Sequence, residues 1–331
     1  MSDVETLKKL KETRDAIKSE LSRAIVGQEQ TIDALISCLL CGGNCLLTGV
    51  PGLAKTLLVR SLAQTLNLSF SRIQFTPDLM PSDIIGTEIL QEDKTTRSRS
   101  LKFQQGPLFA NLVLADEINR TPPKTQAALL EAMQEGQATV GGQTYAQPKP
   151  FFVLATQNPI EQGGTYPLPE AQLDRFMFNV PLTYPNEKDE LEVILRCQPG
   201  ESAPLKAQAS GELIRQFQKL VRSMPVDEQT ARRALTIVRQ SRPDETSCDA
   251  VRQYVRWGAG PRAGQYLVLA ARAAAAMDGR VNPLPEDVKK VAPLVMRHRI
   301  VLNFHAEAEN VNADEVVKQI VASCELRVAR N

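Results

Sequence analysis

The sequence predicts an α/β fold, in which a parallel sheet is sandwiched by helices and followed by a smaller all-helical domain. Two observations predict this class. Short apolar runs alternate with stretches of helical periodicity in the first half of the chain, which is typical of parallel strands joined by crossover helices. After Pro185 only helical periodicity remains. We therefore expect a first domain over residues 1–196 and a helical domain over residues 197–331, in line with about 150 residues per domain.

The elements of the first domain can be assigned in chain order. Near-helical spacing of apolar residues predicts a helix over residues 5–24, and a second helix follows that stops at Gly42-Gly43. A third helix is expected over Thr56–Leu66. Strands that are buried on both faces appear as short apolar runs. Four such runs occur: Cys45–Leu47, Ile73–Phe75, Leu112–Ala115 and Phe151–Ala155.

Two segments interrupt this alternation. Residues 80–108 hold no long periodic segment and carry a polar, charged run from Gln91 to Ser100, so we expect a long irregular insert here. Residues 137–149 place Gly141-Gly142 between two short runs, which predicts a β-hairpin. Beyond Pro185 the expected helices are residues 186–196, 210–222, 229–241, 247–256, 262–278 and 285–297.

Composition limits the classes of function. Thirty-nine basic residues oppose 38 acidic ones, so no global charge favours nucleic acid or an anionic membrane as partner. No apolar run approaches the roughly 20 residues of a membrane span, and the polar N-terminus lacks the apolar core of a signal peptide. The six cysteines are scattered and do not form a secreted disulfide framework. We expect a cytoplasmic protein that neither binds nucleic acid nor inserts into a membrane.

The sharpest motif is Gly49-Val50-Pro51-Gly52-Leu53-Ala54-Lys55-Thr56. A phosphate-binding loop reads G-x-x-x-x-G-K-[ST], and here Ala54 takes the place of the second glycine. The motif keeps its role if position 54 needs only a small side chain and helical dihedral angles. Loop N–H groups and the start of the next helix would then hold the phosphates, Lys55 would neutralise them, and Thr56 would bind Mg²⁺. The alternative is a chance glycine-rich turn, against which the preceding strand and following helix argue.

Polar side chains follow two of the expected strands. Asp116 and Glu117 come directly after Leu112–Ala115, and Asn158 follows Phe151–Ala155 closely. The carboxyl ends of strands are where ligands bind in open α/β sheets. Asp116 would hold Mg²⁺ through water, Glu117 would polarise the attacking water, and Asn158 would contact the γ-phosphate or that water. Asn158 before a proline is equally explained as a turn residue.

Two arginines complete the set. Arg175 lies in Asp174-Arg175-Phe176, and an arginine supplied by a neighbouring subunit can accelerate phosphoryl transfer by about 10³- to 10⁵-fold. Arg175 could instead pair with Asp174 or Glu170. Arg262 follows Pro261, which can open a helix. A cation in a first helical turn is disfavoured by the helix dipole, so Arg262 indicates either an anionic ligand or an acidic neighbour.

The order of these elements resembles that of AAA+ ATPases of the MoxR family, which are related to magnesium-chelatase I subunits and to the helix-2-insert group. The likeness covers essentially the whole chain, with Gly260 in place of a serine common in the family. The strings that carry it are Ile25–Gln28, Gly49–Thr56, Asp116–Glu135, Ala155–Pro159, Glu170–Phe176 and Gly258–Arg262.

The resemblance implies a role for each motif. Lys55 and Thr56 match Walker A, Asp116 and Glu117 match Walker B, and Asn158 matches sensor 1. Arg175 matches the arginine finger and Arg262 matches sensor 2. Thr56 and Asp116 are the implied Mg²⁺ residues. The implied nucleotide-binding residues are Val26, Gly27, Gly49, Val50, Pro51, Gly52, Leu53, Ala54, Lys55, Thr56 and Leu57.

The resemblance also implies a function. We expect Mg²⁺-dependent ATP hydrolysis in a ring of identical subunits, by resemblance a hexamer, that remodels, assembles or activates a protein client. A partner with a von Willebrand factor A domain is implied. The insert and the hairpin are expected to face the client. Two alternatives are a nucleic-acid motor, for which the hairpin offers only Tyr145 and Lys149, and a slow nucleotide switch, against which Glu117 and Arg175 argue.

Overall fold

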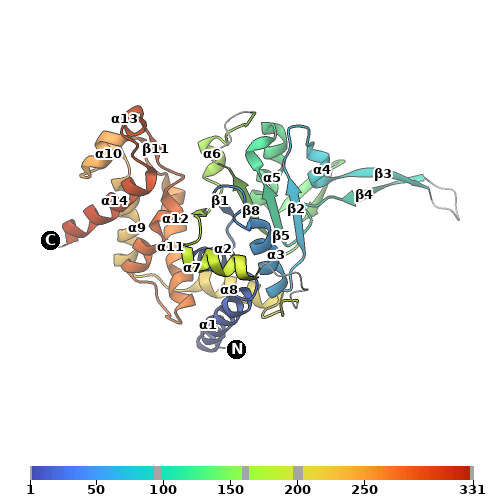
Figure 1. Ribbon diagram of the computed structural model, residues 1–331, viewed down its shortest axis with the longest axis horizontal. Helices are drawn as coiled ribbons and strands as arrows, with labels where there is room; N and C mark the ends of the chain where they lie inside the picture. Colours follow the sequence, from blue (N-terminus) through green and yellow to red (C-terminus); the bar gives the residue numbers. More distant parts are fainter. Residues whose placement is uncertain (1, 93–98, 159–163, 197–203, 329–331) are drawn as a thin grey trace.

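A five-stranded sheet forms the centre of the molecule, with strand order β2-β5-β8-β1-β9 and every pairing parallel (Figure 1). The computed structural model describes residues 2–92, 99–158, 164–196 and 204–328. The strands of the sheet are β1 (Cys45–Thr48), β2 (Phe70–Gln74), β5 (Leu112–Asp116), β8 (Phe152–Gln157) and β9 (Phe178–Pro181). The four predicted strands and their parallel arrangement are confirmed. The edge strand β9 was not predicted, because Asn179 interrupts its short apolar run.

Helices cover both faces of this sheet, because successive strand side chains point to opposite faces. Leu47 packs with the helices of one face, whereas Leu46 packs with those of the other. The first face carries α1 (Asp3–Leu21), α2 (Glu29–Cys41) and α3 (Lys55–Thr65). The second carries α4 (Pro81–Ile85) and α5 (Pro123–Glu135). The sandwich of helices and sheet is therefore confirmed.

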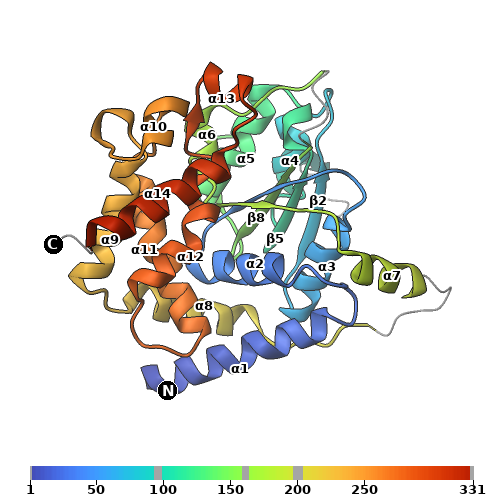
Figure 2. The ribbon, with the colours of Figure 1, turned by 60° about the vertical axis from the view of Figure 1, so that its left-hand side comes forward.

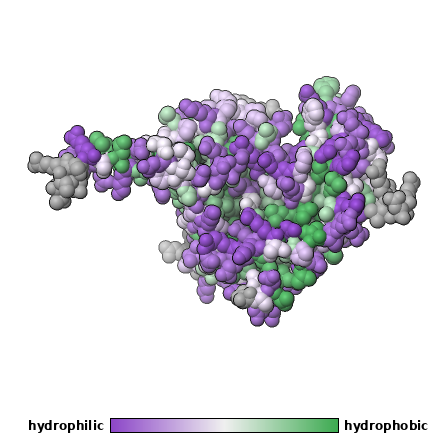
Figure 3. Space-filling model, turned by 180° about the vertical axis from the view of Figure 1, so that it is seen from behind, coloured by the Kyte–Doolittle hydropathy of each residue, from purple (hydrophilic) through white to green (hydrophobic). Residues whose placement is uncertain are grey.

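The insert is not irregular. Residues 86–92 and 99–105 form an antiparallel pair of strands, β3 (Gly86–Glu92) and β4 (Arg99–Gln105), which projects from the body (Figures 1 and 3). The expectation of an irregular segment was wrong because both faces of this hairpin are largely exposed, so no buried face imposes an apolar alternation. The central part of the polar run, residues 93–98, lies outside the described residues.

The hairpin expected over residues 137–149 is confirmed. It consists of β6 (Gln137–Val140) and β7 (Gln143–Ala146), joined by Gly141 and Gly142, both with positive φ. Such angles suit a tight two-residue turn and favour glycine. The Tyr145 ring of β7 stacks on Phe103 of β4 with centroids 4.1 Å apart. The two hairpins are thus packed against one another.

The C-terminal region is helical, as expected. Its helices are α7 (Glu187–Arg196), α8 (Gly211–Ser223), α9 (Glu228–Gln240), α10 (Asp249–Tyr254), α11 (Pro261–Met277), α12 (Pro285–Met296), α13 (Phe304–Ala308) and α14 (Ala313–Val328). It also contains a short antiparallel pair, β10 (Val255–Trp257) with β11 (Val301–Leu302), so it is not wholly helical. Strands of two or three residues are too short to show a period in the sequence.

The division between residues 196 and 197 stays a prediction. Helix α8 packs on α1 and α2 as well as on α11 of the C-terminal region, so it joins the two parts (Figure 2). Among the described helices, none is both long and apolar enough to span a membrane. The thiols of Cys38, Cys41 and Cys45 are buried, and within the described residues no cluster of potential metal ligands is found.

Candidate functional site

A cavity of about 460 Å³ opens at the carboxyl edge of the sheet. It is bounded on one side by the loop that joins β1 to α3 and on the other by the ends of β2, β5 and β8. Its lining residues are Pro51, Gly52, Leu53, Ala54, Lys55, Thr56, Leu57, Arg72, Gln74, Asp116, Glu117, Thr156 and Asn158. The structure thus brings the predicted phosphate loop, the two carboxylates and Asn158 to one cavity.

Glycines give the loop its shape. A Cβ atom on Gly49 would lie 2.7 Å from the Leu182 carbonyl oxygen, so only glycine allows the chain after β9 to pass this close. Gly52 has φ of 86°, and a Cβ there would meet nothing within 4 Å. The backbone at Gly52 is therefore open to the cavity, as close approach of a phosphate requires.

Ala54 does not have the helical dihedral angles expected for it. It precedes α3 with φ of 54° and ψ of 26°, in the left-handed region. A side chain with a Cβ is disfavoured there by about 1–2 kcal/mol. Strain of this kind tends to persist where the surrounding structure enforces it, often at ligand-binding loops. The glycine of the general motif therefore has a conformational reason, and Ala54 satisfies the motif at some energetic cost.

Lys55 is placed for an anionic ligand. Its ammonium group is about half-buried and donates to the Gly49 carbonyl oxygen. Burial lowers the pKa of Lys55, although the nearby charges of Asp116 and Glu117 act to raise it. A partly desolvated ammonium at a helix start suits the phosphates of a nucleotide. With the hydroxyl of Thr56 and the carboxylate of Asp116 on the same cavity, the residues also offer the oxygen ligands that Mg²⁺ prefers.

The Asp116 side chain is held by two neighbours. Thr156 Oγ1 donates to Asp116 Oδ1 at 2.7 Å, and the Glu117 N–H donates to the same Oγ1 at 2.8 Å. Arg72 of β2 contacts Asp116 Oδ2 at 2.6 Å. Thr156 therefore orients the Asp116 carboxylate and holds the backbone of Glu117 from the adjacent strand.

Glu117 is held in a conformation that is unusual for a glutamate, with φ of 58° and ψ of 49°. Its Oε2 accepts hydrogen bonds from Gln74 Nε2 and Arg120 Nη1, both at 2.9 Å. A glutamate must release such partners before that oxygen can accept a proton from water. Gln74 and Arg120 are thus placed to control the orientation of the Glu117 side chain.

Sequence reasoning missed Arg72, Gln74, Arg120 and Thr156. The sequence did contain a signal for Arg72 and Gln74. They occupy alternate positions of Phe70–Gln74, and the register pairs Gln74 with Asp116. Polar residues at the end of a strand beside the acidic pair can reach its carboxylates. That β2 pairs with β5 is a tertiary fact, which the spacing of strands along the chain does not reveal.

Val26 and Gly27 lie beside the loop without lining the cavity. Gln28 Nε2 donates to the Leu53 carbonyl oxygen at 3.3 Å, which brings this segment against the phosphate loop. A Cβ on Gly27, with φ of 65°, would lie 2.5 Å from Asp189 Oδ2 of α7. The part assigned to Val26 and Gly27 in adenine binding stays a prediction.

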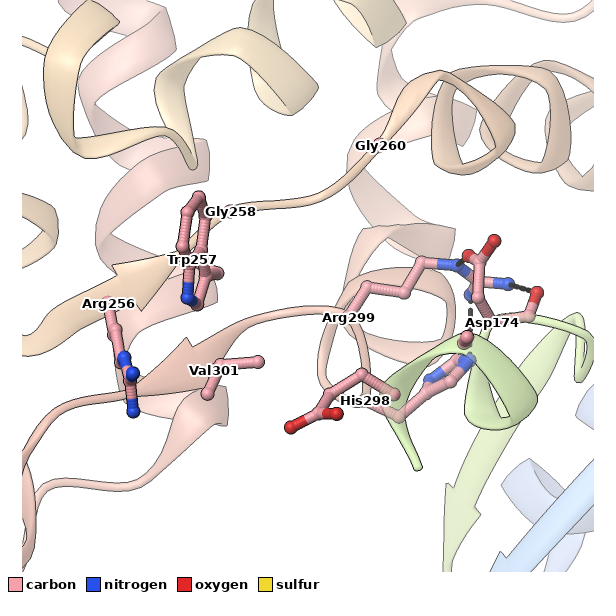
Figure 4. Close-up of a pocket in the computed structure, with 10 residues that line it drawn as sticks. Asp174, Arg256, Trp257, Gly258, Gly260, His298, Arg299 and Val301 are labelled. Carbon is pink, nitrogen blue, oxygen red and sulfur yellow. Dashed lines mark hydrogen bonds and ion pairs between the residues drawn. The ribbon is translucent and has the colours of Figure 1, made fainter. Parts of the chain in front are cut away.

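Arg175 and Arg262 are not among the described residues that line the cavity. Arg262 Nη1 instead donates to Asp174 Oδ2 at 2.8 Å, so an acidic neighbour satisfies it here. Arg299 Nε donates to Asp174 Oδ1 at 2.7 Å (Figure 4). Since two other arginines occupy Asp174, Arg175 does not use that local partner. Among the described residues we find no hydrogen bond or ion pair of the Arg175 side chain.

A second cavity, of about 450 Å³, adjoins this group of charges and lies between α6 (Glu170–Leu173) and the β10–β11 pair (Figure 4). His298 lines it and is half-buried, with Nε2 at 3.0 Å from the Phe176 carbonyl oxygen. Burial lowers the pKa of His298 well below its usual 6.5, and the charge of Arg299 lowers it further. Both effects favour the neutral form of His298.

Comparisons with known proteins agree with this geometry. The chain matches the ATPase family associated with various cellular activities (AAA) over residues 44–178, and the AAA lid domain over residues 249–320. It is 43% identical to Chaperone MoxR1 of Mycobacterium tuberculosis, over 93% of this chain and 80% of that protein. It is 32% identical to Protein MoxR of Paracoccus denitrificans, over 88% of each.

A solved structure shows the same fold. The crystal structure of a candidate ATPase from Cytophaga hutchinsonii superposes with a TM-score of 0.87 at 40% identity, over 96% of each chain. The structural match therefore extends through the helical lid. The loop, the acidic strand end and the lid occur together in this chain as they do in AAA ATPases. This protein is an ATPase and belongs to the MoxR family of AAA+ proteins.

Proposed function

We propose that this ATPase hydrolyses ATP with Mg²⁺ in a ring of identical subunits, a hexamer, and uses the energy to remodel, assemble or activate a protein client. Lys55 and the loop would bind the phosphates, and Thr56 and Asp116 would hold Mg²⁺. Glu117 would orient and deprotonate water after leaving Gln74 and Arg120. The similar protein of Mycobacterium tuberculosis is named a chaperone, which supports remodelling.

The placement of Arg175 is the observation that supports assembly into a ring. It lies outside its own subunit's cavity, and its local acidic partner is taken by Arg262 and Arg299. We infer that Arg175 completes the site of a neighbouring subunit. Removing an arginine of this kind costs about 10³- to 10⁵-fold in rate in the best-studied cases.

Mixed rings test this proposal. Arg175→Ala should bind ATP normally and hydrolyse it poorly, whereas Lys55→Ala should lose binding because the phosphate charge is left uncompensated. Rings that contain both variants should regain part of the activity, since some interfaces combine an intact loop with an intact arginine. If demonstrably mixed rings show no recovery, Arg175 does not act across the interface. Glu117→Gln should bind ATP without turnover, and full activity in that variant would remove Glu117 from its role.

We also propose that the two hairpins face the client. Leu90 and Leu101 are paired across β3–β4 and are 62% and 66% exposed, and apolar side chains lie along the projecting arm in Figure 3. Exposed apolar residues on a rigid scaffold are typical of binding surfaces. Replacing Leu90 and Leu101 with Ser should leave basal ATPase intact and reduce stimulation by the client. Unchanged stimulation would place the client elsewhere.

The nucleic-acid alternative loses support because Tyr145 is stacked on Phe103 and is not free to stack on a base. A partner with a von Willebrand factor A domain and a cytoplasmic location are parts of the same proposal. Buried, free cysteines fit a reducing compartment. Isolation of the protein from its host with the proteins that accompany it would identify the partner.

A further inference from the structure

Helix α7 is amphipathic, but its apolar face points to solvent and its polar face points to the protein. None of its residues is buried. Its polar side faces the body of the protein, because Arg196 donates to the Ser22 and Arg23 carbonyl oxygens and Asp189 lies against Gly27. Residues three and four apart share a helix face. The opposite face therefore carries Leu191, Ile194 and Leu195, which are 55%, 65% and 65% exposed.

An apolar groove lies on the lid between α9 and α11. Its volume is about 520 Å³, and Leu235, Val238 and Val268 are among its lining residues. The first turns of α11 contribute Pro261 and Gly264. Gly264 leaves room in the groove, since a Cβ there would meet only Val238 Cγ2, at 3.8 Å.

The charges of the two surfaces are complementary. Arg242 and Arg272 are the charged residues among those lining the groove. Helix α7 has four acidic residues (Glu187, Asp189, Glu190, Glu192) against two basic ones (Lys188, Arg196). Glu187 and Glu190 lie beside the apolar face by helical spacing. An apolar stripe with acidic edges thus fits an apolar groove with basic ends.

One chain cannot bring these surfaces together, because α7 lies at one end of the molecule and α9 at the other (Figure 2). We propose that the apolar face of α7 in one subunit docks into the α9–α11 groove of the next subunit, a second copy of this chain. Contacts between two different surfaces of identical subunits are head-to-tail, and such contacts close into rings when the rotation allows. This inference rests on the ring of the proposed function and assigns its interface.

Docking of α7 would also affect ATP hydrolysis. The groove is formed partly by the residues on either side of Arg262, so a neighbour's α7 seated there would fix the first turn of α11. ATP turnover per subunit should then rise as subunits associate, through Arg262 as well as Arg175.

The experiment compares assembly of full-length variants by analytical ultracentrifugation with ATP. Leu191→Asp combined with Ile194→Asp should weaken association at least tenfold, while binding of a fluorescent ATP analogue by the dilute subunit is unchanged. Val281→Asp, at a residue 56% exposed on neither surface, is the matched control and should assemble normally. On the groove side, Gly264→Leu should block assembly, whereas Gly264→Ala fits without contact closer than 3.8 Å and should not.

Cross-linking gives a second readout that does not depend on folding of disruptive variants. Ile194→Cys and Leu235→Cys in a Cys197→Ser chain should be joined between subunits by a short bismaleimide only under assembling conditions. Normal assembly of the Leu191 and Ile194 double variant would contradict the proposed interface, even if that variant lost stimulation by the client. Failure of this cross-link in assembled rings would contradict it as well. A wild-type chain that never assembles would refute the ring itself, which is a different result.

Discussion

Arg262 donates a 2.8 Å hydrogen bond to Asp174, which ties the first turn of α11 in the lid to the end of α6 beside Arg175. The same carboxylate accepts from Arg299, whose side chain is only 2% exposed. Asp174 thus neutralises one exposed and one buried cation. Because Arg175 is the next residue after Asp174, a change at Arg262 can also reach Arg175.

The two ion pairs of Asp174 should differ in their contribution to stability. Asp174→Ala should lower the free energy of unfolding by about 3 kcal/mol, because Arg299 would be left as a buried charge without its carboxylate. Arg262→Ala should cost no more than about 1 kcal/mol, because Arg262 is 45% exposed. Urea unfolding of both variants provides the comparison. Equal losses in the free energy of unfolding would contradict a larger contribution from the Asp174–Arg299 pair.

Thr156 should be needed for hydrolysis as a positioning residue. Thr156→Val keeps the shape of the side chain and removes both hydrogen bonds, to Asp116 and from Glu117. We expect a loss of Mg²⁺ affinity and turnover of about 10- to 100-fold, as for other groups that orient metal ligands. Thr156→Ser retains the hydroxyl and should therefore retain both the Mg²⁺ affinity and the turnover. The measurement is phosphate release as a function of Mg²⁺ concentration, and equal behaviour of the Val and Ser variants would argue against this role.

Ala54→Gly should stabilise the protein by about 1 kcal/mol, because glycine relieves the left-handed strain at φ of 54°. Ala54→Val should do the reverse and weaken nucleotide binding, since β-branched residues tolerate this conformation least. Thermal unfolding and titration with an ATP analogue check the pair. A destabilised Ala54→Gly variant would mean that the backbone relaxes at this position.

The junction at His298 should make stability sensitive to acid. The pKa of His298 in the folded protein lies well below 6.5 because of burial and Arg299, so below pH 6.5 the unfolded chain binds a proton that the folded chain does not. The contribution of His298 to the free energy of unfolding is therefore fully present above pH 6.5 and is lost as the pH decreases from there. His298→Gln removes this titration and should flatten the pH profile of unfolding in mildly acidic buffer. His305→Gln, at an exposed residue, is the control, and coincident profiles for both variants would reject the assignment.

Much of the candidate site could be predicted from the sequence, because its residues lie in continuous strings. Gly49–Thr56 and Asp116-Glu117 each follow an apolar strand, and the sheet brings those strand ends together. The partners of these residues could not be predicted. Arg72, Gln74 and Thr156 reach the acidic pair only because β2 and β8 flank β5, and strand order is a property of tertiary packing.

The insert shows a second limit of sequence patterns. Leu90 pairs with Leu101 in a regular hairpin, yet both leucines are exposed, so the rule that apolar residues mark a buried face does not apply. The short strands Val255–Trp257 and Val301–Leu302 escape prediction for a different reason, because their pairing joins segments far apart in the chain.

The stacking of Tyr145 on Phe103 has a mechanical consequence for the two hairpins. Helix α5 begins three residues after the Glu117–Arg120 contact and runs to Glu135, where β6 begins almost at once. A tilt of α5 would swing β6–β7, and the aromatic pair would carry β3–β4 with it. The two hairpins would then move as one unit about the end of α5 near Glu117, and a small rotation there would become a larger displacement of the described ends of β3 and β4, Glu92 and Arg99.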